Sequence, residues 1–123
     1  MFEIKVTEQF CASHQLRGHD GRCENLHGHN WQVDVAAESR ELDKIGVVVD
    51  FEEVKRTLHD ILEEFDHRNL NDCPPFDNGK NPTAELLAEH IYASLEKAFG
   101  AGRFRFTSVT VWETKDACAT YRP

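Results

Sequence analysis

The segment from residue 27 to residue 37 constrains the fold most strongly, because every second position carries an apolar or imidazole side chain. These positions are His27, His29, Trp31, Val33, Val35 and Ala37. Successive side chains of a β-strand point to opposite faces of a sheet, so a period of two is typical of a strand with one buried face. The pattern predicts such a strand and places two histidines on its buried face.

The remaining patterns predict an α+β fold. Further strands are expected at residues 2–14, 47–49, 104–113 and 117–121, with loops at 17–26, 39–46 and 66–80. Asp50 is a typical N-cap, with Glu53 as its capping partner, for a helix over residues 51–65. Residues 81–83 open a second helix that ends before Gly100. The order β-β-β-α-α-β-β predicts an antiparallel sheet with two helices on one face, in a single domain over residues 1–123.

Charge and hydropathy exclude several classes of partner. The chain has 14 Lys and Arg against 22 Asp and Glu, a net charge of −8, which argues against nonspecific nucleic-acid binding. No stretch approaches the ~20 consecutive apolar residues that a membrane-spanning helix needs, and the N-terminus lacks the pattern of a secretory signal. We therefore expect a cytoplasmic protein with no membrane partner. Its four cysteines, which form no C-x-x-C pair, are not expected to form disulfides.

The paired histidines predict a metal site. His27 and His29 are two residues apart on one strand, so both imidazoles can approach a single point. His14, at the end of the first strand, is the natural third ligand if the first two strands are neighbours. Three imidazoles suit a catalytic zinc ion with an open fourth position. The alternative is that these are hydrogen-bonded strand histidines with no metal; His19, His59 and His90 carry no such prediction.

Cys23 precedes the paired histidines by four residues and has three possible roles. A loop cysteine beside a dication has a lowered pKa, so its thiolate could act as a base or nucleophile. It could also ligate the metal itself, or be a small buried side chain, which is the commonest fate of a free cysteine. Cys11, Cys73 and Cys118 are interpreted as structural.

Two further features carry carboxylates. Asp66 and His67 stand side by side near the end of the first helix, where a carboxylate can orient an imidazole for acid–base work, although helix capping is the simpler interpretation. Glu113 shares the strand face of Val109 and Val111. A buried carboxylate there needs donors, which a ligand with two adjacent N–H groups would supply; the alternative is a strand end already in solvent.

Six short motifs, in order along nearly the whole chain, resemble the 6-pyruvoyl-tetrahydropterin synthase superfamily, and within it the 6-carboxy-tetrahydropterin synthase branch. The motifs are F-x-A-S-H at Phe10–His14, C-x-x-x-H-G-H at Cys23–His29, V-V-D-F at Val48–Phe51, Asp66–Asn71, Asn81–Glu85 and Trp112–Thr114. The combination is specific, although each motif alone is common.

The resemblance implies a role for each candidate. His14, His27 and His29 would bind Zn²⁺, Cys23 would be the general base, and Asp66 with His67 would form a second acid–base relay. Glu113 would anchor the pterin as a bidentate acceptor. The fold implied is a tunnelling fold, in which subunits associate so that their sheets close a barrel. Such proteins are homohexamers, dimers of trimers, with active sites at subunit interfaces.

The resemblance also implies a reaction. A zinc-dependent lyase would convert 7,8-dihydroneopterin triphosphate to 6-carboxy-5,6,7,8-tetrahydropterin, acetaldehyde and triphosphate, in queuosine and 7-deazaguanine biosynthesis. Arg17, Arg22, Lys80 and Lys115 are loop cations that could neutralise the triphosphate, although each is also explained as a solvated surface charge.

Three alternatives to this activity stay open to different degrees. The first is 6-pyruvoyl-tetrahydropterin synthase, against which the three-residue spacer between Cys23 and His27 argues. The second is a non-enzymatic zinc- or pterin-binding module, which would need neither Cys23 nor His67. A zinc hydrolase would need a glutamate base within a zinc-binding helix motif, which the chain lacks.

Overall fold

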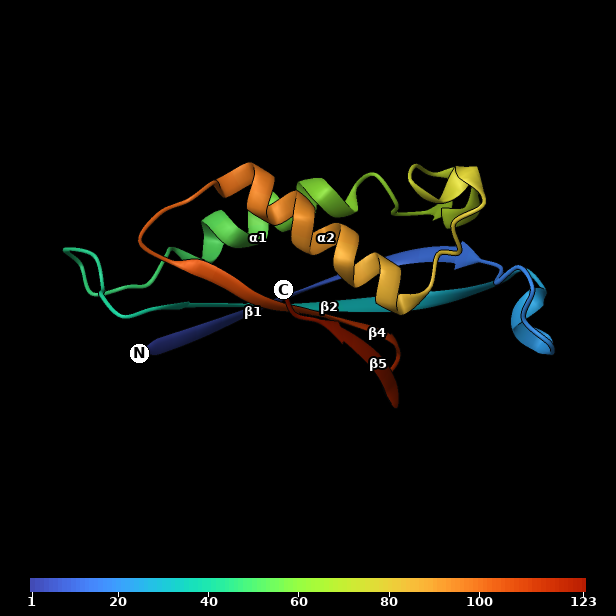
Figure 1. Ribbon diagram of the computed structural model, residues 1–123, viewed down its shortest axis with the longest axis horizontal. Coiled ribbons are helices and arrows are strands. Elements are labelled where there is room, and N and C mark those ends of the chain that lie inside the picture. Colours follow the sequence, from blue (N-terminus) through green and yellow to red (C-terminus); the bar gives the residue numbers. More distant parts are fainter.

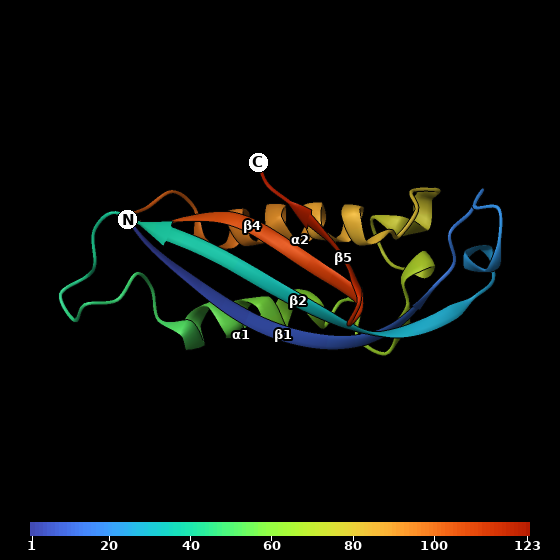
Figure 2. The same ribbon diagram turned by 90° about the horizontal axis from the view of Figure 1, so that it is seen from below.

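A computed structural model describes residues 1–123 as one curved sheet with two helices packed on one of its faces (Figure 1). The strands are β1 (Phe2–His14), β2 (His27–Ser39), β3 (Arg68–Asn69), β4 (Arg105–Thr114) and β5 (Ala117–Tyr121), and the helices are α1 (Phe51–Leu62) and α2 (Ala84–Phe99). Seen from the sheet side, both helices lie behind the strands (Figure 2). The predicted α+β fold, with both helices on one face, is confirmed.

The sheet order is β3-β1-β2-β4-β5. β1 and β2 pair antiparallel over their full length, from Phe2 opposite Ser39 to His14 opposite His27. β4 and β5 continue the antiparallel pairing, but β3 adds a two-residue parallel pairing at the other edge, beside Ala12 and Ser13. The sheet is therefore mixed, where the sequence predicted an antiparallel one.

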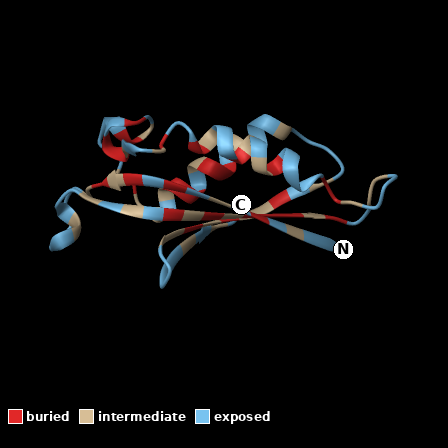
Figure 3. Cartoon of the chain, turned by 180° about the vertical axis from the view of Figure 1, so that it is seen from behind, coloured by how far each residue is buried: buried red, intermediate tan, exposed pale blue.

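The period of two in β2 produces the buried face that it predicts. Trp31, Val33 and Val35 have at most 1% of their surface exposed. Leu58 of α1 and Leu87 of α2 are fully buried in the same core. Buried residues gather where the helices meet the sheet (Figure 3), so the two layers share one core.

Both predicted helix starts are confirmed by cap geometry, although the Glu53 side chain does not form the hydrogen bond of the predicted capping partner. The Asp50 side chain accepts a hydrogen bond from the backbone N–H of Glu52 at 2.9 Å, and Thr83 accepts from Leu86 at 3.1 Å. These bonds satisfy N–H groups that the first helical turn leaves without a partner. The first helix ends at Leu62 rather than at residue 65, and turns follow it.

The predicted strand at residues 47–49 is wrong. Val48 and Val49 are buried, but the segment joins no sheet. The guanidinium of Arg103 donates instead to the carbonyl of Val48 at 2.8 Å, and Asp43 closes a turn onto Val47. The apolar run therefore indicates only that this segment is buried. The Arg103 side chain forms a backbone hydrogen bond that a neighbouring strand would otherwise have formed.

Neither helix is both long and apolar enough to cross a membrane. All four cysteines are free. Cys73 is buried, as its structural interpretation requires, but Cys11 and Cys118 are exposed, so that interpretation does not hold for these two.

Candidate metal centre and active site

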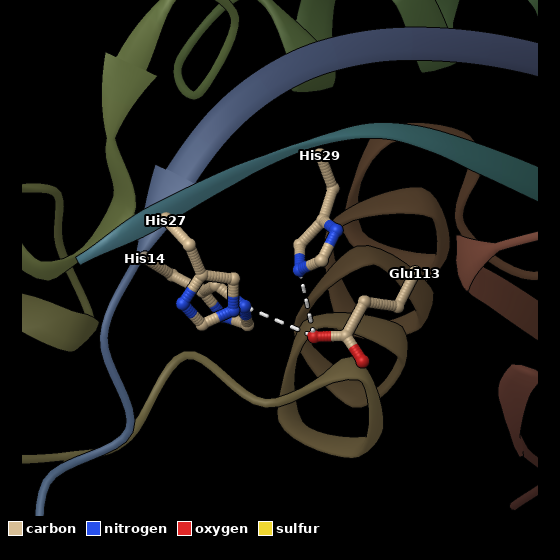
Figure 4. Close-up of side chains that lie close together, drawn as sticks. All are labelled: His14, His27, His29 and Glu113. Atoms are coloured by element: carbon tan, nitrogen blue, oxygen red, sulfur yellow. Dashed lines mark ion pairs between the residues drawn. The ribbon is translucent and has the colours of Figure 1, made fainter. Parts of the chain in front are cut away.

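Three imidazoles converge at one end of the sheet (Figure 4). His14 closes β1, and its register partner His27 opens β2, with His29 two residues further along the same face. The ring centroids of His14 and His27 are 4.6 Å apart, and those of His27 and His29 are 4.8 Å apart. The convergence predicted from strand parity is therefore present in the structure, and the ligand atoms of all three lie within 4.8 Å of one another.

Backbone carbonyls determine which nitrogen of two of these rings carries the proton. Nδ1 of His14 lies 2.8 Å from the carbonyl oxygen of Pro82, and Nδ1 of His27 lies 2.7 Å from that of Asn25. A carbonyl only accepts, so each Nδ1 is the donor and each Nε2 keeps its lone pair. Fixing the outer nitrogen of a histidine in this way is typical of metal ligands.

Glu113 reaches the same point from β4. The register of β4 with β5 shifts between Trp112 and Thr114, and such a bulge redirects the side chain at that position. Its Oε1 lies 3.0 Å from Nε2 of His14 and 3.2 Å from Nε2 of His29, yet neither nitrogen makes a hydrogen bond. At His14, whose Nδ1 carries the proton, the Nε2 lone pair faces a carboxylate oxygen, an arrangement that a cation between them would stabilise.

Burial favours the neutral form of His14 and His29, which is the form that binds metals. His14 is fully buried and the His29 side chain is 17% exposed, both with their rings edge-on to Trp31. Burial lowers the pKa of His14 and of His29, against the opposing effect of the Glu113 carboxylate. Three imidazoles with a nearby carboxylate are a donor set that suits zinc.

Two asparagines hold the chain that leaves β1, and sequence reasoning assigned them no role. The Asn71 amide accepts from the backbone N–H of Gln15 and donates to its carbonyl, at 2.8 and 2.9 Å. Asn81 does the same for Arg17, at 2.9 and 2.8 Å. Each side-chain amide forms the pair of hydrogen bonds that a neighbouring strand would form. These bonds connect the loops before α2 to the segment that follows His14. Both residues belong to motifs quoted above, which was the only signal for them.

A surface cavity of about 570 Å³ opens beside this centre. Its lining includes His29, Glu113, Trp112, Gln32 and Lys115. Of the four loop cations considered for triphosphate binding, Lys115 is the one that lines this cavity. The same cavity therefore contains Glu113, the carboxylate predicted to anchor a pterin, and one positive charge, that of Lys115.

Asp66 and His67 form a second cluster with Cys11. Asp66 Oδ2 lies 3.0 Å from Nδ1 of His67, while its Oδ1 accepts from the backbone N–H of Cys11 at 2.9 Å. That backbone bond is the main reason why the pKa of Asp66 is lowered, and the His67 side chain adds to the effect. The carboxylate orients the imidazole rather than capping α1. His67 and Cys11 line a cavity of about 500 Å³ that shares Gly28 and His29 with the first.

Cys23 lies apart from both clusters. It occupies the short helical turn at Arg22–Glu24, is partly buried, and lines neither cavity. Arg17, Arg22 and Lys80 also line neither one. The chain thus brings together the metal ligands and Glu113, and Asp66 with His67, but it does not bring Cys23 to either group.

Comparisons with known proteins agree with the motifs. The family model described as 6-pyruvoyl tetrahydropterin synthase matches residues 3–123. A Synechocystis protein named 6-carboxy-5,6,7,8-tetrahydropterin synthase is 37% identical, covering 98% of this chain and 93% of the relative. A Bacillus subtilis protein of the same name is 31% identical, covering 99% and 86%.

A solved structure agrees with the fold. The 6-pyruvoyl tetrahydropterin synthase of Caenorhabditis elegans superposes with a TM-score of 0.86 at 26% identity, covering 99% of this chain and 95% of that one. The resemblance drawn from the six motifs is confirmed by both kinds of comparison. The chain belongs to the 6-pyruvoyl tetrahydropterin synthase family, whose relatives named here are enzymes.

Proposed function

We propose that the chain is a zinc-dependent 6-carboxy-tetrahydropterin synthase. The substrate is 7,8-dihydroneopterin triphosphate, and the products are 6-carboxy-5,6,7,8-tetrahydropterin, acetaldehyde and triphosphate. The observation that carries the proposal is the three-histidine centre, whose ligand atoms lie within 4.8 Å of one another and of a carboxylate that lines an open cavity. The names of the Synechocystis and Bacillus relatives support the carboxy branch.

His14, His27 and His29 are the proposed zinc ligands. Bound zinc would act as a Lewis acid toward the side-chain oxygens of the substrate. The two backbone carbonyls that hold the Nδ1 protons keep the rings oriented for this. The alternative for Glu113, a fourth ligand, is compatible with its distances, so the test below separates it from pterin binding.

Glu113 is the proposed pterin anchor. Its side chain is 31% exposed and lines the larger cavity, so a ligand can reach it. A carboxylate accepts two parallel hydrogen bonds from the ring N–H and exocyclic amine of a pterin. Lys115 on the same cavity supplies one positive charge for the triphosphate.

Asp66, His67 and Cys23 are the proposed proton carriers. Asp66 holds the His67 ring through Nδ1, which leaves Nε2 to exchange a proton with the substrate. Cys23 lines neither cavity of its own chain. An active site at the interface between subunits of a hexamer, a dimer of trimers, accounts for this separation, as the resemblance implies.

Mixing two inactive variants tests that interface. Cys23→Ala and His67→Asn chains, unfolded together and refolded as mixed oligomers, are expected to regain a fraction of wild-type turnover, because some sites then receive an intact thiol and an intact imidazole from different chains. Each variant refolded alone is the control. Mixed oligomers that stay inactive would place both groups of one site on one chain.

Product analysis tests the reaction. From 7,8-dihydroneopterin triphosphate, mass spectrometry is expected to find 6-carboxy-5,6,7,8-tetrahydropterin, and a coupled assay is expected to find acetaldehyde. A pterin that keeps all three side-chain carbons would move the chain to the pyruvoyl branch, which the likeness to the Caenorhabditis structure favours. Binding without turnover would make it a pterin-binding module. In the cell, the protein is proposed to act in the cytoplasm, where its product would be used for queuosine and 7-deazaguanine synthesis.

A further inference from the structure

The cluster formed by Cys11, Asp66 and His67 presents three different donors to one point. A thiol sulfur, a carboxylate oxygen and an imidazole nitrogen all lie within 4.8 Å of one another. Asp66 and His67 have a proposed role in proton transfer, but Cys11 has none. The position of the Cys11 thiol beside the Asp66–His67 pair is therefore not explained by the proposed reaction.

The backbone holds these donors in place. The N–H of Cys11 donates to Asp66 Oδ1 at 2.9 Å, and the N–H of His67 donates to the carbonyl of Cys11 at 2.6 Å. The parallel pairing of β1 with β3 starts at the next residue, Ala12 opposite Arg68. Cys11 is thus positioned by β1, and two hydrogen bonds to its backbone hold the turn that carries Asp66 and His67, which lowers the entropy cost of binding an ion.

The donor types select one class of ion. Thiolate, imidazole and carboxylate together are ligands of zinc and similar divalent transition metals, whereas calcium and magnesium take oxygen ligands. Three protein ligands leave an open coordination position for water. The Cys11 thiol donates to Asn30 Oδ1 at 3.0 Å, and its deprotonation on metal binding would release that bond.

The cluster shares no ligand with the three-histidine centre, although His29 lines the same cavity as Cys11 and His67. Side chains alternate along β1, so Cys11 points away from the buried face that carries Phe10, Ala12 and His14, and it shares the outer face with its register partner Asn30. Cys11 is exposed, and the His67 side chain is 78% exposed. On the single chain, this face is open to an ion from solution.

We propose that Cys11, Asp66 and His67 form a second binding site for a zinc-like divalent transition metal ion. Where the proposed function also holds, an ion bound to Asp66 and His67 takes both residues out of proton transfer, so excess zinc inhibits turnover. Binding itself does not depend on the reaction.

Cobalt titration of the zinc-loaded full chain tests the site directly. After one equivalent of zinc, added Co²⁺ is expected to give thiolate-to-cobalt charge-transfer absorption, which a three-histidine centre does not produce. Cys11→Ser is expected to lose this absorption and the second equivalent of metal in elemental analysis. His67→Asn, which keeps a residue type that tolerates the positive φ of 60° at this position, is expected to weaken it.

Two matched variants make the result decisive. Cys118→Ser removes another exposed thiol, which belongs to no such cluster, and is expected to bind like wild type. Cys23→Ser is expected to keep the absorption. Absorption that survives Cys11→Ser, that disappears in Cys23→Ser, or that never develops would overturn the proposal. Inhibition by excess zinc is measured separately; a chain that binds the second ion but lacks synthase activity would refute the proposed function alone.

Discussion

Zinc binding to the three-histidine centre should stabilise the folded chain, and His27→Ala should abolish this effect. His27 is chosen because it is only partly buried, so its truncation removes a ligand with little loss of core packing, whereas His14 is fully buried against Trp31. In the folded chain, β1 and β2 bring His14 to His27 and His29. The unfolded chain has no such arrangement, so zinc binds the folded state selectively.

The size of the effect follows from linkage. At free zinc 100-fold above the dissociation constant, the folded state gains about 2.7 kcal/mol. With an unfolding entropy of about 2.1 cal/mol/K per residue, a chain of 123 residues has a total of about 0.26 kcal/mol/K. The expected rise in Tm is therefore about 10 °C.

Thermal unfolding at fixed protein concentration, with zinc or with a chelator, measures this rise. His27→Ala in a Cys11→Ser background, which lacks the proposed second site, is expected to show a rise of less than about 2 °C, since two imidazoles bind zinc much more weakly than three. His59→Ala is the matched control, because His59 lies exposed on α1, forms an ion pair with Glu63 and belongs to neither metal cluster, so its zinc response should equal that of wild type. A full zinc response in His27→Ala in the Cys11→Ser background would refute the assignment of the centre.

Three further predictions concern single side chains. Cys23→Ala should retain its zinc while turnover falls by about 10²-fold or more, the usual scale for a general acid–base; loss of zinc would make Cys23 a ligand, and unchanged turnover would leave it a packing residue. Glu113→Gln should weaken pterin binding by about 1–3 kcal/mol in calorimetry while the zinc content stays constant. The reason is that the NH₂ group of the glutamine amide, a donor, would face an N–H donor of the pterin. Loss of zinc would instead make Glu113 the fourth ligand. His90 is packed against Phe65 and Phe76, and burial lowers its pKa, so the unfolded chain binds more protons and stability falls as pH drops below about 6.5. In chelator-treated protein, His90→Gln should make that acid-side fall in the free energy of unfolding shallower, and identical pH profiles would contradict the assignment.

Local pattern was sufficient for the elements whose stability comes from one buried face or one cap. Neighbouring residues determine the period of two in β2, the cap at Asp50 and the start of α2 after residues 81–83, so the sequence could predict them. The strand predicted at residues 47–49 was wrong because an apolar run indicates burial but does not show which groups form hydrogen bonds with its backbone. Arg103, which satisfies the Val48 carbonyl, lies 55 residues away and has no local signal.

The sequence could predict the ligands of the metal centre, but not the backbone groups that hold their rings in orientation. Parity places His27 and His29 on one face, and the register of β1 with β2 adds His14. The carbonyls of Asn25 and Pro82 then decide the ring tautomers. Every residue has a carbonyl, so no residue type could identify these two before the loops were placed.

Cys11 shows how far parity extends beyond a buried face. The same alternation that assigns Phe10, Ala12 and His14 to the core assigns Cys11 to the outer face, so its interpretation as a structural residue conflicted with the pattern already in use. What parity could not supply was the partner. Asp66 and His67 reach Cys11 through a two-residue parallel pairing between β1 and β3, which are separated by more than 50 residues. Such a short strand has no period to detect, so the chemistry of this edge depends on a contact that only the folded chain makes.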